Sequence, residues 1–462
     1  MQSVSYQIPT AKSFPVYTQV TVHVLLAILI YLVPPIAATY GILFFSYGLL
    51  RVIQTQNRNN EAAFFAVYLA CYEIIMRMSG YVIMYEFGKY STSFVLMVGL
   101  MVERNQRKLP IAGILYFVLL IPAIFAGNYY SFDYFKTSVS FNLSGPFSLM
   151  MAWVYFMNRK FTKEEFEKLI LRMILPIVMV CVLILLKVPT HHNFAEETGS
   201  TKAFSGGFGP NQVSVVLGFG FFVSALSILL GQKIFDSRIA SFFPPFVFIV
   251  FGIMTFSRGG VITGVIAFIL STFIYIRLGR GSRQFSRMFF GSLLFLIVIY
   301  TLWSVINSYT DNSISRRYES TVTESNEGAG QAGHYTERLK IAELDIAAFR
   351  AHPILGNGPE GASRFRSLNY NNALTAHTEY TRLLGDHGSL GAIALLIMVI
   401  SPFYYFRRRK GDNKIILIGF MSICFLTMFH AAMRVAIPGL AFGLGLIDVN
   451  LEDHSLEREK TG

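Results

Sequence analysis

The stretch AHTEYTRLLGDHGSLGAIALLIMVI, residues 376–400, changes in character part-way along. Its first part is polar and contains His377 and His387, whereas residues 392–400 are all apolar. An uninterrupted apolar run of this kind predicts a helix that enters a lipid bilayer. The stretch therefore places a titratable side chain at the threshold of a membrane span.

The composition of the whole chain agrees with a membrane location. Of 462 residues, 53% are hydrophobic, 15% are aromatic and only 14% are charged. Because backbone polar groups in a bilayer must be satisfied within each segment, spans of this length indicate helices rather than a barrel. We expect an all-α, polytopic transmembrane bundle of about 12–14 spans. The apolar runs lie at residues 19–34, 36–53, 62–80, 91–103, 110–127, 145–157, 168–187, 211–229, 239–256, 260–277, 288–306, 388–406, 414–430 and 433–447.

Basic residues near the span ends predict the orientation of the bundle, because cytoplasmic loops carry an excess of Lys and Arg. In this span order every basic cluster falls on one side, so both termini are expected in the cytoplasm. Residues 188–210, 257–260 and 307–387 are then outside. The net charge of +12 signals topology, and we expect no nucleic-acid partner. The clusters are Arg51/Arg58, Arg104/Arg107/Lys108, Arg159 to Arg172, Lys233/Arg238, Arg277/Arg280/Arg283/Arg287 and the segment from Arg407.

The segment 307–387 is too long for a simple connector, and loops of this length usually carry function. We therefore expect an N-terminal bundle of about 11 spans at 1–306, an extracytoplasmic catalytic loop at 307–387, and C-terminal spans with a tail at 388–462. Within the loop, apolar residues at helical spacing predict an amphipathic helix that Pro353 ends and that lies on the outer membrane surface or caps the bundle. These residues are Leu339, Ala342, Ile346 and Phe349.

Several classes of enzyme are excluded by motifs that the sequence lacks. It contains no GxxxxGK[ST] phosphate loop, no Asp-x-Asp pair, no HExxH motif and no Cys/His cluster, so we expect neither a metal nor another cofactor. Cys71, Cys181 and Cys424 all lie in apolar runs and are expected to be small core residues. The polar N-terminus and the first span show no cleavage pattern, so no removable signal peptide is expected.

Charged residues in apolar surroundings are informative, because they are costly at membrane depth unless they are paired or face water. Arg258 is either an interfacial arginine or an anion site that Gly259 and Gly260 open to a bulky ligand. Glu73 and Arg77, spaced i,i+4, predict an internal ion pair. His430 and Arg434 have the same spacing, and either role suits them.

Two further features bear on a possible site. Pro210, Asn211 and Gln212 stand just before a span, where Pro suits the first turn and Asn a cap. Lining of a polar cavity is the alternative role. His377 is able to act as a base near neutral pH, although it is one of four histidines in the loop and, from residue type alone, a surface or capping role is the more common one.

The order of these elements resembles the O-antigen ligase and polymerase family. The motifs that carry the resemblance are a PN element before a span, an SRG link, a loop arginine, hPxxGxG and HxxYxxxLx[DE]xGxxG. They span about residues 205–400. In this sequence they are Pro210–Asn211, Ser257–Arg258–Gly259, Arg338, His352–Gly358, and His377, Tyr380, Leu384, Asp386, Gly388 and Gly391.

The sequence departs from the family pattern at three places. Thr378 stands where Asn is frequent after the histidine, and Asp386 stands where Glu is frequent. A Trp that is common after the loop arginine is absent, with Glu343 nearby. These departures concern the placement of individual residues more than membership of the family.

The resemblance implies a GT-C-like, metal-independent, inverting glycosyltransferase on the outer face of the bacterial plasma membrane. Its donor would be a glycan on undecaprenyl diphosphate, and its acceptor a sugar hydroxyl of a glycan or lipid. A flippase and a chain-length regulator are implied as partners. His377 would be the general base, and Arg258 and Arg338 would hold the diphosphate.

The resemblance also assigns secondary roles. Arg316 and Arg317 are further candidates for phosphate binding, and Glu379 for orienting His377 or binding acceptor hydroxyls. Asn211 and Tyr380 are candidate substrate-binding residues. Gly388 and Gly391 would let the next span pack closely, whereas His387 receives no role.

The sequence leaves several functions open. We favour a polysaccharide polymerase for O-antigen, capsule or exopolysaccharide, with a ligase that transfers glycan to lipid A core or protein as the alternative. A solute transporter is a second alternative, although the sequence shows no convincing half-to-half repeat. A scaffold in an envelope assembly complex is a third, and it predicts that His377→Ala is silent.

Overall fold

The computed structural model describes residues 14–104, 108–188, 202–235, 237–279, 304, 308, 332–370, 376 and 378–451, of which 238 and 332–338 are described in their backbone alone. Over these residues the chain is an assembly of packed helices with one short pair of strands. The elements are α1 (Val16–Leu32), α2 (Ile36–Thr55), α3 (Glu61–Ser79), α4 (Phe87–Val102), α5 (Ile111–Val118), η1 (Ile121–Ala126), α6 (Phe132–Phe156), β1 (Lys160–Thr162), α7 (Lys163–Lys187), η2 (Ala203–Ser205), α8 (Pro210–Leu229), α9 (Arg238–Met254), α10 (Arg258–Arg277), α13 (Ala332–Ala351), α14 (Gly361–Tyr370), α15 (Glu379–Arg408), α16 (Asp412–His430), α17 (Ile437–Leu444) and β2 (Asp448–Asn450).

The helices confirm the predicted all-α membrane fold. Within the described residues, seven helices are long and apolar enough to cross a membrane, namely α2, α3, α7, α8, α10, α15 and α16. Apolar side chains such as Leu25, Leu43 and Leu50 are largely exposed on α1 and α2, as expected of helices that face lipid. Cys71, Cys181 and Cys424 are free and buried in the core. The protein is therefore a multi-pass membrane protein.

The boundaries differ from the prediction where polar residues enter a helix. The short run predicted at 145–157 belongs to α6, which begins at Phe132 and is 25 residues long, because Ser131 caps it and the polar residues Ser138, Asn142 and Ser144 in its middle are buried. The run at 110–127 is instead broken after Val118 and resumes as a 3-10 turn. Of the run at 433–447 only the eight residues of α17 are helical. Apart from residue 304, the run at 288–306 lies outside the described residues.

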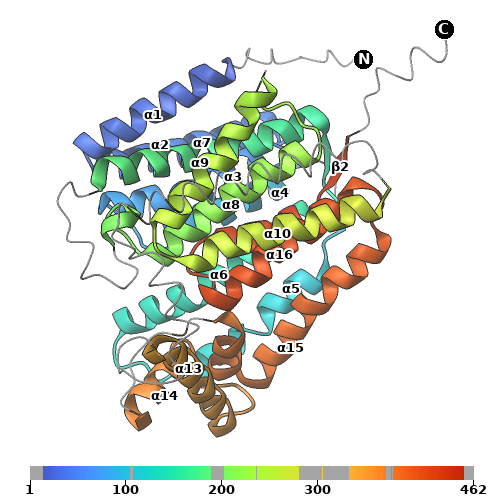
Figure 1. Ribbon diagram of the computed structural model, residues 1–462. Coiled ribbons are helices and arrows are strands. Elements are labelled where there is room, and N and C mark those ends of the chain that lie inside the picture. The colour runs from blue at the N-terminus through green and yellow to red at the C-terminus, as the bar shows by residue number, and fades with distance from the viewer. Residues whose placement is uncertain are drawn as a thin grey trace.

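The two ends of the bundle differ in character. α13 and α14 gather at one end, and α15 runs from them toward the end that carries β2 (Figure 1). At that second end β1 and β2 pair in parallel, with Phe161 opposite Val449. Arg159 is buried beside them, where it donates to the Asn60 side chain at 3.0 Å and pairs with Glu103. Arg159, predicted as part of a topological basic cluster, is thus a structural residue of this end.

The predicted loop helix is present as α13, but its apolar stripe is not the face that packs against the protein. Leu339 and Ile346 are 49% and 37% exposed. The residues that pack inward are Ile341, Leu344, Asp345 and Ala348, one position out of phase with the predicted stripe. A polar residue, Asp345, belongs to the inward face, so an apolar pattern alone does not identify the side of the helix that packs against the protein. As predicted, α13 ends before Pro353.

Glycines set the crossing of α8 and α10. A Cβ on Gly260 would come within 2.1 Å of the Ser214 carbonyl oxygen, and one on Gly264 within 2.3 Å of the Gly218 carbonyl oxygen. On Gly259 it would meet the His430 ring at 2.4 Å. The space beside Gly259 and Gly260 is occupied by neighbouring helices. The two glycines therefore allow helices to pack closely and do not leave room for an anion, which was one of the two expected roles.

α15 is kinked at Gly388, which has φ 60° and ψ −143°. The turn at 353–358 is fastened to this kink by backbone hydrogen bonds, from the Gly358 amide to the Asp386 carbonyl at 2.9 Å and from the Ser389 amide to the Pro353 carbonyl at 2.7 Å. Gly388 and Gly391 do allow close packing, but not of another span. Gly388 lies against the turn at 353–358, and Gly391 lies against the Leu383 carbonyl. The hPxxGxG and HxxYxxxLxDxGxxG motifs therefore form one structural unit.

Candidate active site

A charged pocket lies where α6, α14, α15 and the turn between α16 and α17 meet. It is a small, partly open pocket with a cavity volume of about 40 Å³. Ala376 forms part of its wall, so the pocket reaches the residue that precedes position 377. Its charged lining residues are Lys89, Glu360, Arg366, Glu379, Arg382, Asp386 and Arg434.

The first turns of α15 contribute an acid–base–acid series. Glu379, Arg382 and Asp386 share one helix face because they are spaced i,i+3 and i,i+7. Arg382 Nε donates to Glu379 Oε2 at 3.0 Å, and Arg382 Nη1 lies 3.7 Å from Asp386 Oδ2. The Met433 amide donates to the same Glu379 carboxylate at 3.3 Å. Glu379 is thus fully buried and joins α15 to the turn that carries Arg434.

Asn142 on α6 connects Asp386 to His387. Its Nδ2 donates to Asp386 Oδ2 at 2.7 Å, and its Oδ1 lies 2.8 Å from His387 Nε2. The Ala362 amide also donates to the Asp386 carboxylate, at 2.9 Å. The other ring nitrogen of His387 lies 2.9 Å from the Leu120 carbonyl. The fully buried His387 therefore fastens α15 to the rest of the bundle, which agrees with the absence of a predicted catalytic role.

A buried ion pair between α13 and α14 supports the pocket. Arg366 pairs with Asp345 of α13, and the Thr381 hydroxyl of α15 donates to the same carboxylate at 2.8 Å. Burial raises the pKa of Asp345, and the Arg366 guanidinium opposes this rise. Because removal of one charge would leave the other buried and unpaired, this pair fixes α13, α14 and α15 relative to one another.

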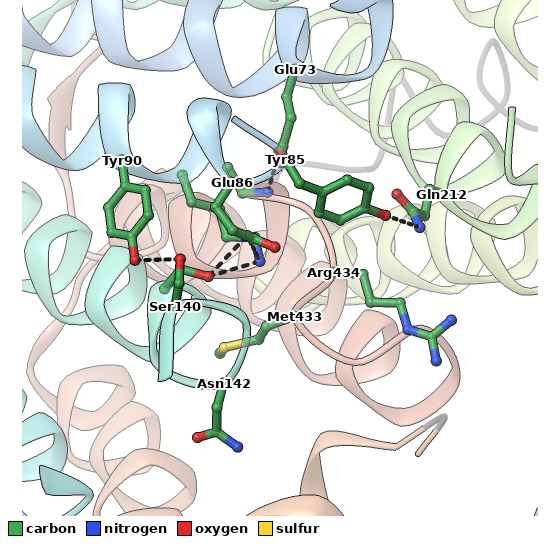
Figure 2. A network of polar contacts seen from close by, with 12 residues as sticks. Glu73, Tyr85, Glu86, Tyr90, Ser140, Asn142, Gln212, Met433 and Arg434 are labelled. Atoms are coloured by element: carbon green, nitrogen blue, oxygen red, sulfur yellow. Dashed lines mark hydrogen bonds and ion pairs between the residues drawn. The ribbon is translucent and has the colours of Figure 1, made fainter. Parts of the chain in front are cut away.

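A second polar network lies on the α4 side of the pocket. Lys89 pairs with Glu86 and donates to Ser144 Oγ at 3.1 Å, and Ser144 donates to Glu86 at 2.9 Å (Figure 2). Tyr90 and Ser140 form a neighbouring contact of 2.9 Å. These hydrogen bonds hold the ammonium group of Lys89 at the pocket wall.

The predicted ion pair between Glu73 and Arg77 is confirmed. Arg77 Nη1 also donates to Gln212 Oε1 at 2.6 Å and to the Arg434 carbonyl at 2.9 Å. The Ala436 amide donates to Glu73 at 2.8 Å. Figure 2 shows Glu73 and Gln212 on one side of the turn that presents Arg434. The pair therefore positions a pocket residue in addition to ordering the bundle.

Arg434 reaches the segment that contains His377. Its Nη2 donates to the Ala376 carbonyl at 2.9 Å. His430 ends α16, so the i,i+4 spacing of these two residues does not continue along one helix. His430 Nε2 lies instead 3.2 Å from the Thr263 hydroxyl. Of the two, Arg434 lines the pocket.

The predicted site residues fall into three groups. His377, Arg316 and Arg317 lie outside the described residues, and Arg338 is described only as backbone within α13. Arg258 is half-buried at the start of α10 and is not part of the pocket lining. Glu379 lines the pocket with its carboxylate engaged by Arg382.

The remaining two predicted residues make contacts between helices. The Tyr380 hydroxyl donates to the Phe425 carbonyl at 2.9 Å, which joins α15 to α16. Asn211 accepts a hydrogen bond from Ser257 at 2.8 Å. α8 begins at Pro210, as predicted, but its N-cap is Gly209, so Asn211 is not the cap. Its neighbour Gln212 contacts Arg77 and Tyr85, and neither Asn211 nor Gln212 lines this pocket.

A family model described as O-antigen ligase matches residues 245–396. Residues 245–396 are therefore similar to the O-antigen ligase family, and this segment is called the O-antigen ligase domain below. This confirms the resemblance to the O-antigen ligase and polymerase family over about a third of the chain, and it indicates function of that general type. Comparison with curated proteins gives no match.

The pocket is only partly built from the O-antigen ligase domain. Glu360, Arg366, Glu379, Arg382 and Asp386 lie within 245–396. The remaining wall comes from α4, α6 and the turn after α16, through Lys89, Asn142 and Arg434. The O-antigen ligase domain therefore requires helices from both sides of it in the sequence to close its pocket.

Sequence reasoning missed most of the charged lining. Arg382 was overlooked although it is spaced to contact both Glu379 and Asp386, a pattern that the sequence contains. Arg366 carried no such signal, because its partner Asp345 lies on a different helix. Lys89 and Asn142 were placed in or near apolar runs, where only the folded chain reveals the pocket.

Replacing Arg77 with Met is expected to destabilise the protein by about 3–5 kcal/mol, because it leaves the Glu73 carboxylate buried without its counter-charge. Thermal unfolding of the purified protein in detergent measures the effect. The double variant Glu73→Gln/Arg77→Met removes both charges and should recover part of the loss. Equal stability of the single and double variants would contradict the role of the pair.

Proposed function

We propose that the protein is a bacterial cell-surface polysaccharide polymerase that uses a glycan on undecaprenyl diphosphate as donor. The O-antigen ligase domain supports this class of reaction. The observation that carries the proposal is the contact of Arg434 with Ala376, because it brings a pocket-lining guanidinium to the residue next to His377. A base and an anion-binding group beside one pocket are what transfer from a diphosphate requires.

In the proposed reaction His377 accepts the proton of the acceptor hydroxyl. The acceptor oxygen then forms a bond to the anomeric carbon of the donor, with inversion, while the bond from that carbon to the diphosphate oxygen breaks. The lipid diphosphate leaves with the electron pair of that bond. No metal is needed if cationic side chains stabilise the developing charge.

Arg434 and Arg258 are the cations that we assign to the leaving diphosphate. Guanidinium groups bind phosphate oxygens in a bidentate manner. Arg258 begins α10, and its neighbour Gly259 packs against His430, four residues before Arg434. Arg338, Arg316 and Arg317 stay further candidates for the same role.

The polar residues of the pocket suit the acceptor sugar. Asp386 and Asn142 present an oxygen and an amide in a fixed hydrogen-bonded arrangement. Sugar hydroxyls both donate and accept hydrogen bonds, so such pairs recognise them well. We assign Asp386, Asn142 and Arg382 to this subsite. The site would face outward, with both termini in the cytoplasm, as the basic clusters predict.

A deletion strain tests the polymerase against the ligase. A polymerase mutant should present single-repeat glycans at the surface. A ligase mutant should instead accumulate long chains on undecaprenyl diphosphate, and that result would replace the polymerase by the ligase. Unchanged glycans in both fractions would contradict the whole assignment. Profiles of lipid-linked and surface glycans with and without the gene give the answer.

Replacing Arg258 with Lys is expected to reduce transfer about 10–100-fold, because an ammonium group cannot reproduce bidentate contacts with phosphate. Polymer formation in membranes that contain equal amounts of protein measures the effect. Arg277→Lys, at the other end of the same helix, is the matched control and should leave transfer unchanged. Wild-type activity of Arg258→Lys would indicate an interfacial arginine instead.

A further inference from the structure

A cluster of aromatic side chains lies at the start of α6 and has no part in the proposed reaction. It consists of Tyr129, Tyr130, Phe132, Tyr134 and Phe135, and is called the aromatic platform below. Tyr130 and Tyr134 stack with ring centroids 4.3 Å apart and planes at 19°. Tyr129 meets Phe135 edge-on at 5.0 Å. The rings therefore support one another in a fixed arrangement.

The aromatic platform is exposed rather than part of the core. Tyr130 and Phe132 are each 76% exposed. Ser131 accepts a hydrogen bond from the Tyr134 amide at 3.1 Å and caps α6, so the segment has a defined backbone. Aromatic rings such as Phe243 and Phe403 are similarly exposed elsewhere in this membrane protein, so the residues around the platform must decide what its rings contact.

The aromatic platform is continuous with the pocket. Tyr134, Ser138 and Phe141 follow one face of α6 at i, i+4 and i+7. Ser138 donates to Glu360 of the pocket at 2.8 Å, and Phe141 lines the pocket itself.

The segment that bears the platform also contacts α14 and the turn before it. Arg364 of α14 donates to the Asn128 carbonyl at 2.5 Å. A Cβ on Gly358 would come within 2.4 Å of Gly127 Cα. Burial raises the pKa of Tyr129 to about 12, with smaller contributions from Tyr134 and from Asp386 of the pocket. The platform and the pocket are therefore neighbouring parts of one surface.

The surroundings of the rings favour a sugar over a membrane. Asp133 and Lys136 stand among the rings with side chains 91% and 67% exposed. A carboxylate in this position is costly in contact with lipid tails, whereas it is favourable in water beside a polar ligand. The C–H faces of pyranose rings pack against aromatic faces, and tyrosine hydroxyls add hydrogen bonds to sugar hydroxyls.

We propose that the aromatic platform is a saccharide-binding subsite that holds the glycan chain at a distance of one or more sugars from the bond-forming step. The inference rests on the proposed function. The pocket itself is small, whereas a growing polymer requires additional surface beside it. The platform supplies that surface, so it controls how long the chain stays bound between transfers.

The test compares Tyr130→Ala/Tyr134→Ala with Tyr130→Phe/Tyr134→Phe. The alanine variant should make surface polymer at least about twofold shorter while still joining single repeats, because two stacking faces are lost. The phenylalanine variant keeps the faces and should retain near-normal length. Tyr31→Ala, a 40% exposed tyrosine on α1, is the control for a general membrane role of tyrosine. Polymer length is read from gels at equal protein amounts.

A binding measurement separates this inference from the proposed function. The probe is a set of acid-released fragments of the strain's own surface polysaccharide, and the protein is the full chain purified as His377→Ala. Loss of Tyr130 and Tyr134 should weaken fragment binding about tenfold. Equal fragment binding by the proteins with and without Tyr130 and Tyr134 would overturn the inference. This holds even if the separate polymer assay shows that His377→Ala abolishes polymer. If His377→Ala leaves polymer intact, the proposed function fails instead.

Two further outcomes have a defined meaning. Equal shortening by Tyr31→Ala would indicate an interfacial aromatic belt and would overturn the saccharide subsite. If the double alanine variant does not accumulate, Tyr130→Ser takes its place. The ring of Tyr130 is exposed, so its removal is not expected to disturb the fold. Unchanged fragment binding by the Tyr130→Ser variant would equally overturn the proposal.

Discussion

Replacing His377 with Ala is expected to abolish surface polymer while the amount of protein in the membrane stays normal. Without a general base the acceptor hydroxyl must lose its proton to water, which costs about 10²–10⁴ in rate. Every added unit requires the same step, so chain growth is slowed by this factor at each addition. Polymer on gels and protein on immunoblots of the same membranes measure the two quantities.

The matched control for this prediction is His352→Ala. His352 lies in the same predicted loop and its side chain is exposed, so its loss should leave polymer unchanged. A scaffold would tolerate both substitutions equally. Full-length polymer from the His377→Ala variant would therefore refute the catalytic assignment, whereas equal loss in both variants would point to disruption of the loop.

Replacing Gly388 with Ala is expected to inactivate the protein by disrupting its fold. The residue has φ 60° and ψ −143°, a conformation that costs an L-amino acid roughly 1–3 kcal/mol. In addition, the new Cβ would lie 2.6 Å from the Gly356 nitrogen and from the Ile354 oxygen. Because both neighbours are backbone atoms, the turn at 353–358 would have to detach from the kink. The residues on α15 that line the pocket would then lose their support.

Gly231→Ala separates strain from steric conflict. Gly231 also has a positive φ, of 69°, but nothing lies within 4 Å of its missing Cβ. Its substitution should lower the thermal midpoint of the detergent-solubilised protein only slightly, while Gly388→Ala should lower it strongly and remove activity. Similar midpoints for the two variants would mean that contact with the turn contributes little.

The sequence predicted the membrane helices well because hydrophobicity determines them directly. α2, α3, α7, α8, α10 and α16 begin and end within a few residues of the predicted runs. The prediction failed where buried polar residues replace apolar ones. The early start of α6 and the inward face of α13 depend on Asn142 and Asp345, whose burial requires partners on other helices. Apolar periodicity contains no information about such partners.

The candidate site was predictable only in part, for the same reason. The motif around Glu379 and Asp386 could be recognised from its residue pattern, and Glu379 does line the pocket. Arg434 was noticed but was assigned no definite role. Lys89 and Asn142 reach the pocket because α4 and α6 pack against the domain, a consequence of tertiary structure. The roles of His377, Arg258 and Arg338 stay predictions for experiment.

The strand pair at the second end of the bundle has a consequence for biogenesis. Lys160 pairs with Asp448, so β1 cannot acquire its partner until nearly the whole chain has been synthesised. At about 5–20 residues per second, translation leaves β1 and the α6–α7 junction unpaired for on the order of tens of seconds. The N-terminal helices must therefore be inserted and then wait, incomplete, for α17 and β2 to arrive. A stop codon just before residue 448 would accordingly keep the seven long spans of the described residues and still remove β2, the partner of β1.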